Sequence, residues 1–282
     1  MAVTTLMQCG SMAVTDYRCS RGPHDAPYAE HHEAFCMAYV RKGSFGYRYR
    51  GQMLELVAGS VLLGRPGDEY MCTHDHTCGD ECLAFSFSPE LAETIGAGNE
   101  FWRAGSVPPA SETMVAGELA QAAADGGCDL GLDELGLLLA ALCAGIVAAR
   151  PKRDWRASAR DRRRMVEAAL WLEARAQEPT ELETAACVAG LSPYHFLRLF
   201  STVLGVTPHQ YLVRTRLRHA ARMLADGGRS ITDIALEAGF ADLSNFVRTF
   251  HRAAGVSPRQ FRRAANGDRK LFQELCAARR AS

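Results

Sequence analysis

The chain has 282 residues, a formal net charge of zero and 48% hydrophobic residues, which predicts about two domains with enough apolar material for buried cores. No apolar stretch approaches the roughly 20 residues of a membrane helix, and no basic region followed by an apolar run opens the chain. We therefore expect a soluble cytoplasmic protein with no membrane partner. The ten cysteines then predict reduced thiols, with metal or redox use at some of them.

Charge separates the two halves of the chain. Residues 1–155 carry 11 Lys+Arg and 20 Asp+Glu, a net charge of −9, whereas residues 156–282 carry 21 and 12, a net charge of +9. Arginine supplies nearly all of the positive charge in the second half, and its planar guanidinium group suits phosphates and guanine edges. This segregation predicts that only the second half binds a polyanion.

Short alternating segments predict β-strands in the first half. Apolar residues alternate over 35–39 and 45–49, and turn residues stand at 51–52 and 66–68. Further strand segments are expected at 53–57, 61–63, 70–76 and 82–87. Strands at a spacing of about ten residues predict a sandwich or a small barrel.

Two helical segments follow, Glu112–Asp125 and Asp133–Arg150. The second is apolar almost all round, which predicts burial either beneath the barrel or against a second subunit. A linker is expected near Pro151–Ala159.

Thiols and imidazoles gather in the strand region, at Cys72, His74, His76, Cys78 and Cys82, with His31 and His32 earlier in the chain. Three interpretations are open. One is a tetrahedral zinc site made by His32, Cys72, His76 and Cys82. The second is a redox or electrophile sensor that switches through Cys72, Cys78 or Cys82. The third is that these side chains line an organic-ligand pocket or a plain core.

The second half predicts two helix-turn-helix units. A helix over 161–176 is followed by a short helix over 182–188, a left-handed turn at Gly190 and a helix with Ser192 as cap and Pro193 in its first position. The second unit has a helix over 231–238 capped by Ser230 or Thr232, a turn at Gly239 and a helix capped by Asp242. A helix from Pro208 to about Leu224, ~25 Å long, joins the units. That length is comparable with the ~34 Å between successive major-groove faces of DNA.

A repeated pattern supports this organisation, because the second copy begins fifty residues after the first. The first copy is Phe196, Arg198, Phe200, Gly205, Val206, Thr207, Pro208, Gln210 and Tyr211. The second is Phe246, Arg248, Phe250, Gly255, Val256, Ser257, Pro258, Gln260 and Phe261. Each copy predicts a helix with one arginine on the side opposite its buried phenylalanines.

The outward faces of these helices are the predicted DNA-reading surfaces. Candidates for base contacts are Tyr194, His195, Leu197 and Arg198 on the first helix and Ser244, Asn245, Val247 and Arg248 on the second. Each arginine has the geometry to bind a guanine bidentately. Candidates for phosphate contacts are Ser201, Arg214, Arg216 and His251, with Arg218, Arg222, Arg262 and Arg263 as further ones. The alternative is that these are ordinary solvated helix faces.

These motifs resemble the AraC/XylS family of bacterial transcription regulators. The strongest resemblance lies in Ile231–Phe240, in Ser244, Phe246, Arg248 and Phe250, and in Gly255–Arg262, while residues 190–200 match the first unit. The resemblance covers roughly residues 165–264. It implies a seven-helix DNA-binding domain whose third and sixth helices enter adjacent major grooves. It also implies a cupin-like effector barrel, matched at Gly59–Gly67, although Tyr70 stands where many relatives have a histidine.

We therefore predict an α+β chain: a cupin-like β-barrel or sandwich with flanking dimerisation helices at 1–152, an all-α double helix-turn-helix domain at 160–265 and a C-terminal extension at 266–282. The expected function is that of a sequence-specific transcription regulator, activator or repressor, controlled by a small-molecule, metal or redox signal at the N-terminal domain. Expected partners are double-stranded promoter DNA in the nucleoid, RNA polymerase for an activator, a second copy of the chain and a small effector, with zinc as candidate cofactor. The protein is not expected to be an enzyme.

The sequence leaves two alternative functions. One is a metal-dependent cupin enzyme with an accessory DNA-binding tail. The adjacent His31 and His32 argue against it, because neighbouring residues on a strand face opposite ways. The other is a repressor that dimerises and senses nothing.

Overall fold

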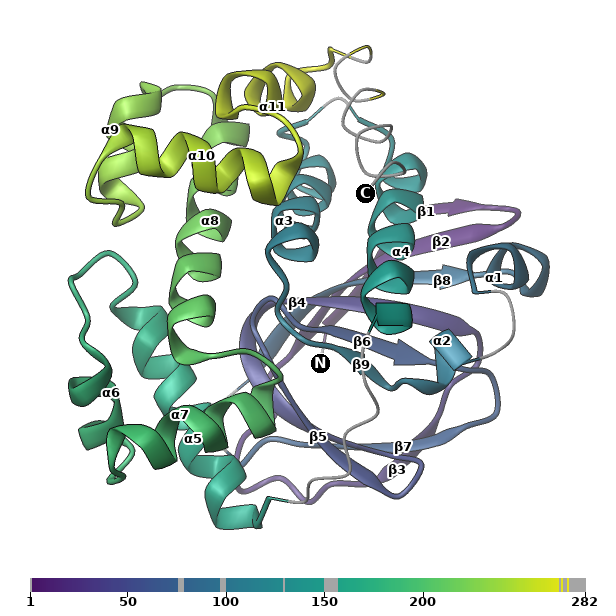
Figure 1. Ribbon diagram of the computed structural model, residues 1–282. Coiled ribbons are helices and arrows are strands. Elements are labelled where there is room, and N and C mark those ends of the chain that lie inside the picture. Colours follow the sequence, from purple (N-terminus) through teal and green to yellow (C-terminus); the bar gives the residue numbers. More distant parts are fainter. Residues whose placement is uncertain are drawn as a thin grey trace.

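A β-rich half is followed by a helical half (Figure 1). The computed structural model describes residues 2–75, 79–96, 100–128, 130–149, 157–268, 270 and 273. The order of strands first and helices later agrees with the α+β expectation. Seven helices lie within residues 157–268, all of which are described, and this matches the number expected for the second half.

The strands of the described residues form two antiparallel layers that share one long strand, β4 (Phe35–Tyr49). The first layer has the order β1-β2-β8-β4-β6-β9, with β1 (Ala2–Cys9), β2 (Met12–Cys19), β8 (Asp80–Phe87), β6 (Val61–Gly64) and β9 (Ser106–Val107). The second layer contains β5 (Gln52–Val57), the end of β4, β7 (Glu69–Thr73) and β3 (Ala29–His31).

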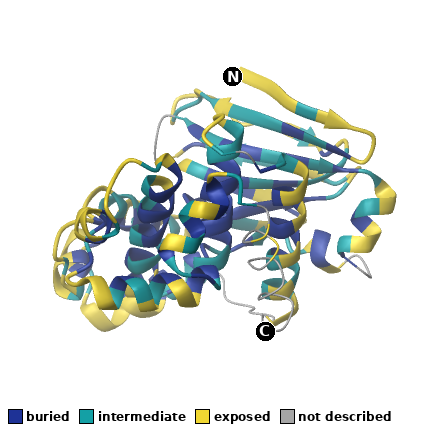
Figure 2. Ribbon diagram, turned by 90° about the horizontal axis from the view of Figure 1, so that it is seen from above, coloured by how far each residue is buried: buried dark blue, intermediate teal, exposed yellow. Residues whose placement is uncertain are grey.

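Strand β4 changes layer at Gly43, because β8 pairs with it as far as this residue and β5 pairs with it from Ser44 onwards. The two segments expected at 35–39 and 45–49 are therefore one strand. The β1–β2 hairpin was not expected from the sequence. Figure 2 shows that β1 is exposed along most of its length, and β1 is an edge strand of the sheet.

Alternating side chains of the first layer serve two cores. Met37, Tyr39 and Phe85 face a large core beneath the helices, whereas Val40 and Cys82 face a smaller core between the two layers. This division follows from the period of two along a strand.

Among the described residues of the β-rich half, four helices occur: α1 (Pro89–Ile95), α2 (Glu100–Arg103), α3 (Ser111–Ala124) and α4 (Leu132–Ala149). Helix α4 packs on α3 and β2 through a side that includes Leu135 and Leu139. Leu137, on the other side, is 41% exposed. By length and composition α4 is apolar enough to cross a membrane. From the sequence we expected no stretch of this kind. The core helix of a soluble protein passes the same test.

The helical half comprises α5 (Ala159–Ala174), α6 (Leu182–Val188), α7 (Pro193–Leu204), α8 (Pro208–Asp226), α9 (Ile231–Glu237), α10 (Leu243–Ala254) and α11 (Pro258–Ala265). Their starts follow local sequence rules. Ser230 caps α9, Asp242 caps α10, and Thr207 and Ser257 begin α8 and α11 with complete capping boxes. Ser192 stands at the N-cap of α7 but its side chain makes no capping hydrogen bond.

The two halves share a core. Buried residues of α8 and α10, such as Leu217 and Phe250, belong to the same hydrophobic cluster as Tyr39 of β4 and Leu119 of α3. Figure 1 shows α3 lying alongside α8, and the two helices are in contact. The connecting helix of the two helix-turn-helix units is therefore also the helix that holds the β-rich half.

Candidate nucleic-acid interface and interior cavity

The first helix-turn-helix unit is α6, the turn at Gly190 and α7. Gly190 has φ of +62°, the left-handed conformation expected for this turn. Arg164 of α5 fixes the turn by donating hydrogen bonds to the carbonyls of Ala189 (2.7 Å) and Gly190 (2.6 Å). Phe196 and Phe200 are fully buried. Their burial sets the rotation of α7 and turns its opposite side outward.

The predicted contact residues of α7 lie on that outward side. Tyr194, His195, Leu197 and Arg198 are all exposed, and Tyr194 is 77% exposed. Ser201 is half-buried, and its hydroxyl donates to the carbonyl of Leu197 (2.8 Å). The structure thus brings the four candidate base-contact residues together on one surface.

The second unit is α9, the turn at Gly239 and α10. Gly239 has φ of +92°, and a Cβ there would lie 2.7 Å from the Ala176 carbonyl oxygen, so the turn requires glycine. Asp242 accepts a hydrogen bond from the Asn245 backbone N–H (2.7 Å) and starts α10. Phe246 and Phe250 are fully buried, as in the first unit.

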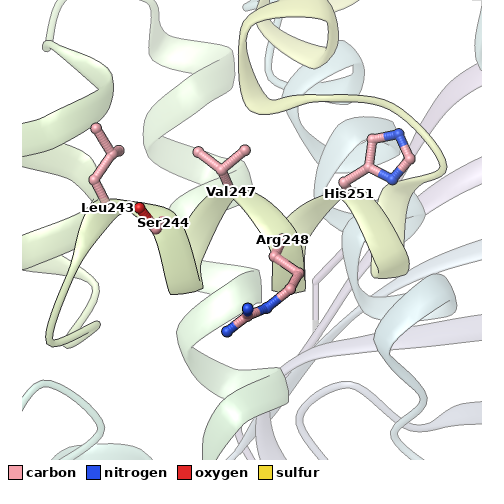
Figure 3. Close-up of a pocket in the computed structure, with 5 residues that line it drawn as sticks. All are labelled: Leu243, Ser244, Val247, Arg248 and His251. Carbon is pink, nitrogen blue, oxygen red and sulfur yellow. The ribbon is translucent and has the colours of Figure 1, made fainter.

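A shallow groove runs along the outward face of α10 (Figure 3). It is lined by Leu243, Ser244, Val247, Arg248 and His251. Ser244, Arg248 and His251 are exposed, whereas Val247 and Asn245 are half-buried. Leu243 was not among the sequence candidates, although its spacing of four residues from Val247 already places it on this face.

Two arginines of α8, Arg214 and Arg216, bind backbone carbonyls of the protein. Arg214 donates to the carbonyl of Pro109 (2.7 Å), and Arg216 donates to the carbonyls of Ala176 (2.6 Å) and Glu178 (3.0 Å). Burial lowers the pKa of both side chains. Their phosphate contacts remain a prediction, which would require these carbonyl contacts to open.

Arg218 corrects a sequence expectation. Its side chain is 2% exposed, so it cannot reach a phosphate, and it pairs with Glu173 of α5 and lies 3.8 Å from Glu118 of α3. Burial alone would lower the pKa of Arg218, but Glu173, Tyr39 and Glu118 together raise it. The charge is therefore structural.

Glu118 of α3 accepts hydrogen bonds from two other elements, β4 and α8. It is 1% exposed and accepts hydrogen bonds from the Tyr39 hydroxyl (2.9 Å) and from Arg222 Nε (3.0 Å). Tyr39 lies on β4 and Arg222 on α8, so this carboxylate joins the two halves.

A cavity of about 160 Å³ lies between the two β layers. His32 lines it: its Nε2 is 2.7 Å from the Tyr47 hydroxyl, its Nδ1 is 3.3 Å from Cys36 Sγ, and its ring stacks on Tyr70 at 4.1 Å. Burial lowers the pKa of His32 to about 4, opposed by Asp68. His32 is therefore neutral at physiological pH. His31 is exposed, so the two adjacent histidines face opposite ways as expected.

Thiols also line the cavity, at Cys19, Cys36, Cys72 and Cys82. Burial raises the pKa of Cys36 to about 12 and raises the pKa values of Cys72 and Cys82 further above their ordinary range. A protonated thiol is a poor nucleophile, which weakens the interpretation of Cys72 and Cys82 as redox sensors. Cys78 lies outside the described residues.

The structure assembles a different set of metal-ligand atoms from the expected one. His32, Cys72 and Cys82 line the same cavity, but His76 lies outside the described residues. Among the residues that the structure describes, the group whose ligand atoms all lie within 4.8 Å of one another is Cys19, His74 and Asp80.

Two helix-turn-helix units on one connecting helix define a class of DNA-binding protein, and comparison with known proteins gives the family. A family model described as a helix-turn-helix domain matches residues 185–264. The probable transcription factor PqrA of Proteus vulgaris is 36% identical over 94 residues, covering 33% of this chain and 77% of that protein. The HTH-type transcriptional activator RhaS of Enterobacter sp. (strain 638) is 27% identical over 253 residues, covering 84% of this chain and 88% of that protein.

The melibiose operon regulatory protein of Escherichia coli (strain K12) is 37% identical over 82 residues, covering 29% of this chain. The chain spans about a quarter of that relative's length, 27%. The chain belongs to the AraC family of transcription regulators. All three relatives are named as regulators or transcription factors, and none of these comparisons supports the enzyme alternative.

Proposed function

We propose that this protein is a sequence-specific DNA-binding transcription regulator whose N-terminal half receives a signal. The observation that carries the proposal is the pair of helices α7 and α10, each with an exposed arginine-bearing face opposite buried phenylalanines. Helix α8 contacts both units and holds them on one support. The net charge of +9 in this half favours a polyanionic partner.

In this proposal α7 and α10 enter two successive major grooves of double-stranded promoter DNA. Arg198 and Arg248 bind guanine edges, because a guanidinium group matches the O6 and N7 acceptors of guanine. Tyr194, Leu197 and Val247 contact thymine methyl groups, and Ser201 and His251 contact phosphates at the ends of the two helices. His195, Ser244 and Asn245 complete the base-contacting set. Arg214 and Arg216 reach phosphates only if they leave the carbonyls of Pro109, Ala176 and Glu178.

The N-terminal half is proposed to be a cupin-like sensor. The cavity lined by His32 lies between its two β layers, and a small effector, a metal ion or a redox change is the proposed signal. The uncovered side of α4, with Leu137 exposed, is proposed to contact a second copy of the chain. RNA polymerase is the further partner if the protein activates transcription in the cytoplasm.

The signal is proposed to pass through Glu118 and Arg222. Both β4 and α3 contribute to this contact, and α8 is the element that spaces the two reading helices. A signal that alters the β layers then shifts the population of chains whose helices fit successive grooves.

The test begins with selection of a binding sequence from randomised duplexes by the full-length protein. Affinity for the selected duplex is then measured by fluorescence anisotropy for the wild type and for a double variant, Arg198→Ala with Arg248→Ala. Each lost bidentate contact removes about 1–3 kcal/mol, so we expect affinity to fall by about 30-fold or more and sequence preference to relax.

The matched control is Arg48→Ala with Arg103→Ala, which removes the same charge from exposed positions of the other half. We expect this control to bind within about threefold of the wild type, since distant charges are screened beyond a Debye length. Equal affinity of the reading-helix variant and the control would refute the assigned faces.

A further inference from the structure

Three side chains of different type meet at one end of the cavity. Cys19 ends β2, Asp80 begins β8, and His74 follows β7. Their ligand atoms all lie within 4.8 Å of one another, and His74 Nε2 is 2.8 Å from Asp80 Oδ2. His74 and Asp80 are buried, with 8% and 5% exposed, and Cys19 is half-buried.

The backbone forces this convergence. Cys19 and Asp80 are direct partners in the antiparallel β2–β8 pairing, so their side chains leave the same face of the sheet. The chain before Asp80 is also bound to the segment that follows β2, because the Gly79 N–H donates to the carbonyl of Arg21 (2.7 Å).

Glycines permit this close approach. Gly79 has φ of +80°, and a Cβ there would lie 2.5 Å from the Cys19 carbonyl oxygen. Gly43 on β4 also has φ of +80°, and its Cβ would lie 2.4 Å from the Gly79 carbonyl oxygen. Side chains at these two positions would separate the strands, so the donor set depends on glycine at both of them.

The types of these three ligand atoms suit a borderline-soft divalent cation. One thiolate, one imidazole and one carboxylate are the ligand types that zinc takes in proteins. Hard cations such as Mg²⁺ and Ca²⁺ prefer oxygen ligands throughout. The Cys82 thiol, which also lines the cavity, lies 3.5 Å from Asp80 Oδ1, so a second sulfur atom stands beside the donor set.

We propose that Cys19, His74 and Asp80 bind one Zn²⁺-like transition metal ion, whose fourth coordination position opens into the cavity. Binding forms an S–metal bond at Cys19, and the thiol proton passes to solvent. The His74–Asp80 hydrogen bond is replaced by metal contacts to both side chains. A regulatory role for this ion rests on the proposed function. Binding of the ion does not, because it is measured without DNA.

The test uses the full-length protein, stripped of metal and kept reduced and anaerobic. Zn²⁺ is titrated in competition with a chromophoric chelator, and Co²⁺ is used as a spectroscopic substitute. We expect one ion per chain and a near-ultraviolet thiolate-to-cobalt absorption band. Cys19→Ser should abolish the band and weaken Zn²⁺ binding by more than about 100-fold. Loss of a residue that only supports a metal ligand weakens binding by up to about 100-fold, and loss of a ligand itself should cost more.

Two controls separate this site from other thiols. Cys9→Ser removes an exposed thiol at the end of β1, and Cys72→Ser removes a cavity thiol outside the proposed set. Both should keep the cobalt band and the Zn²⁺ affinity. His74→Gln, checked for folding by circular dichroism, should weaken Zn²⁺ binding while the thiol remains.

The inference is overturned by a wild-type chain that binds no stoichiometric Zn²⁺ or shows no thiolate-to-cobalt band. Retained binding in Cys19→Ser would overturn it as well. Loss in Cys72→Ser together with retention in Cys19→Ser would assign the ion to the other cavity thiols. None of these outcomes depends on DNA affinity, so failure here leaves the proposed regulator function standing.

Discussion

Replacing Glu118 by glutamine tests whether buried charge fastens the two halves together. Glutamine keeps the shape of the side chain and can still accept from the Tyr39 hydroxyl, but it removes the negative charge opposite Arg218 and Arg222. Removing one partner from a buried ion pair typically costs about 3–5 kcal/mol of unfolding free energy. Because Glu173 still pairs with Arg218, we expect the lower end, about 3 kcal/mol.

The assay is urea unfolding followed by tryptophan fluorescence, with Trp102 reporting the β-rich half and Trp171 the helical half. The matched control, Glu93→Gln on the exposed side of α1, should stay within about 0.5 kcal/mol of the wild type. Adding Arg218→Met to Glu118→Gln should recover part of the loss, because an apolar side chain leaves no unpaired charge. If Glu118→Gln unfolds at the urea midpoint of Glu93→Gln, the carboxylate does not join the halves.

Two further predictions concern a turn and a histidine. Gly239→Ala should lower stability by about 1–3 kcal/mol, because φ is +92° and the new Cβ would meet the Ala176 carbonyl, whereas Gly228→Ala has open space and should change little. Equal thermal melts for the two variants would contradict this. Burial lowers the pKa of His32 and of His219 to about 4, so both bind protons more readily in the unfolded chain. The free energy of unfolding should therefore fall as pH drops from about 6.5 to 4, by roughly 3 kcal/mol for His32 alone. Urea unfolding across this range should show the decline in the wild type and a smaller one in His32→Gln, and a flat wild-type profile would contradict the assignment.

Local sequence rules located the helices well. The short helix expected at 182–188 has those bounds in the structure, and the connecting helix expected to end near Leu224 ends at Asp226. Capping residues and left-handed glycines act within a few residues of one another, so the sequence alone reveals them. The outward faces of α7 and α10 followed from the same short-range periodicity.

Strands were harder to locate. The exposed edge strand β1 gives no alternation of buried and exposed residues, so the pattern on which the prediction relied is missing there. Strand β4 continues through Gly43, whose left-handed φ of +80° lets one strand serve both layers. In the sequence the same glycine resembles a break between two strands.

Long-range contacts could not be derived from local patterns. Glu118 and Arg222 are 104 residues apart, and no short-range rule pairs them, which is why Arg218 and Arg222 were expected to meet phosphates. The same limit applies to the proposed metal ligands. Cys19 was overlooked because the strand that carries it was not expected, and only the pairing of β2 with β8 places it beside Asp80.

The buried carboxylate of Glu118 restricts how this regulator can be recombined. A hybrid protein that keeps α5–α11 but takes its sensing half from another regulator would inherit Arg218 together with the apolar sides of α8 and α10. Unless the incoming half supplies an acid at the place of Glu118, Arg218 would keep only Glu173 of α5 as its acid, and Arg222 would lose the carboxylate that it binds. Exchange of sensing halves, whether by gene fusion in evolution or by design, should therefore lower stability unless α3 travels with α8 or Arg218 is replaced in the same step.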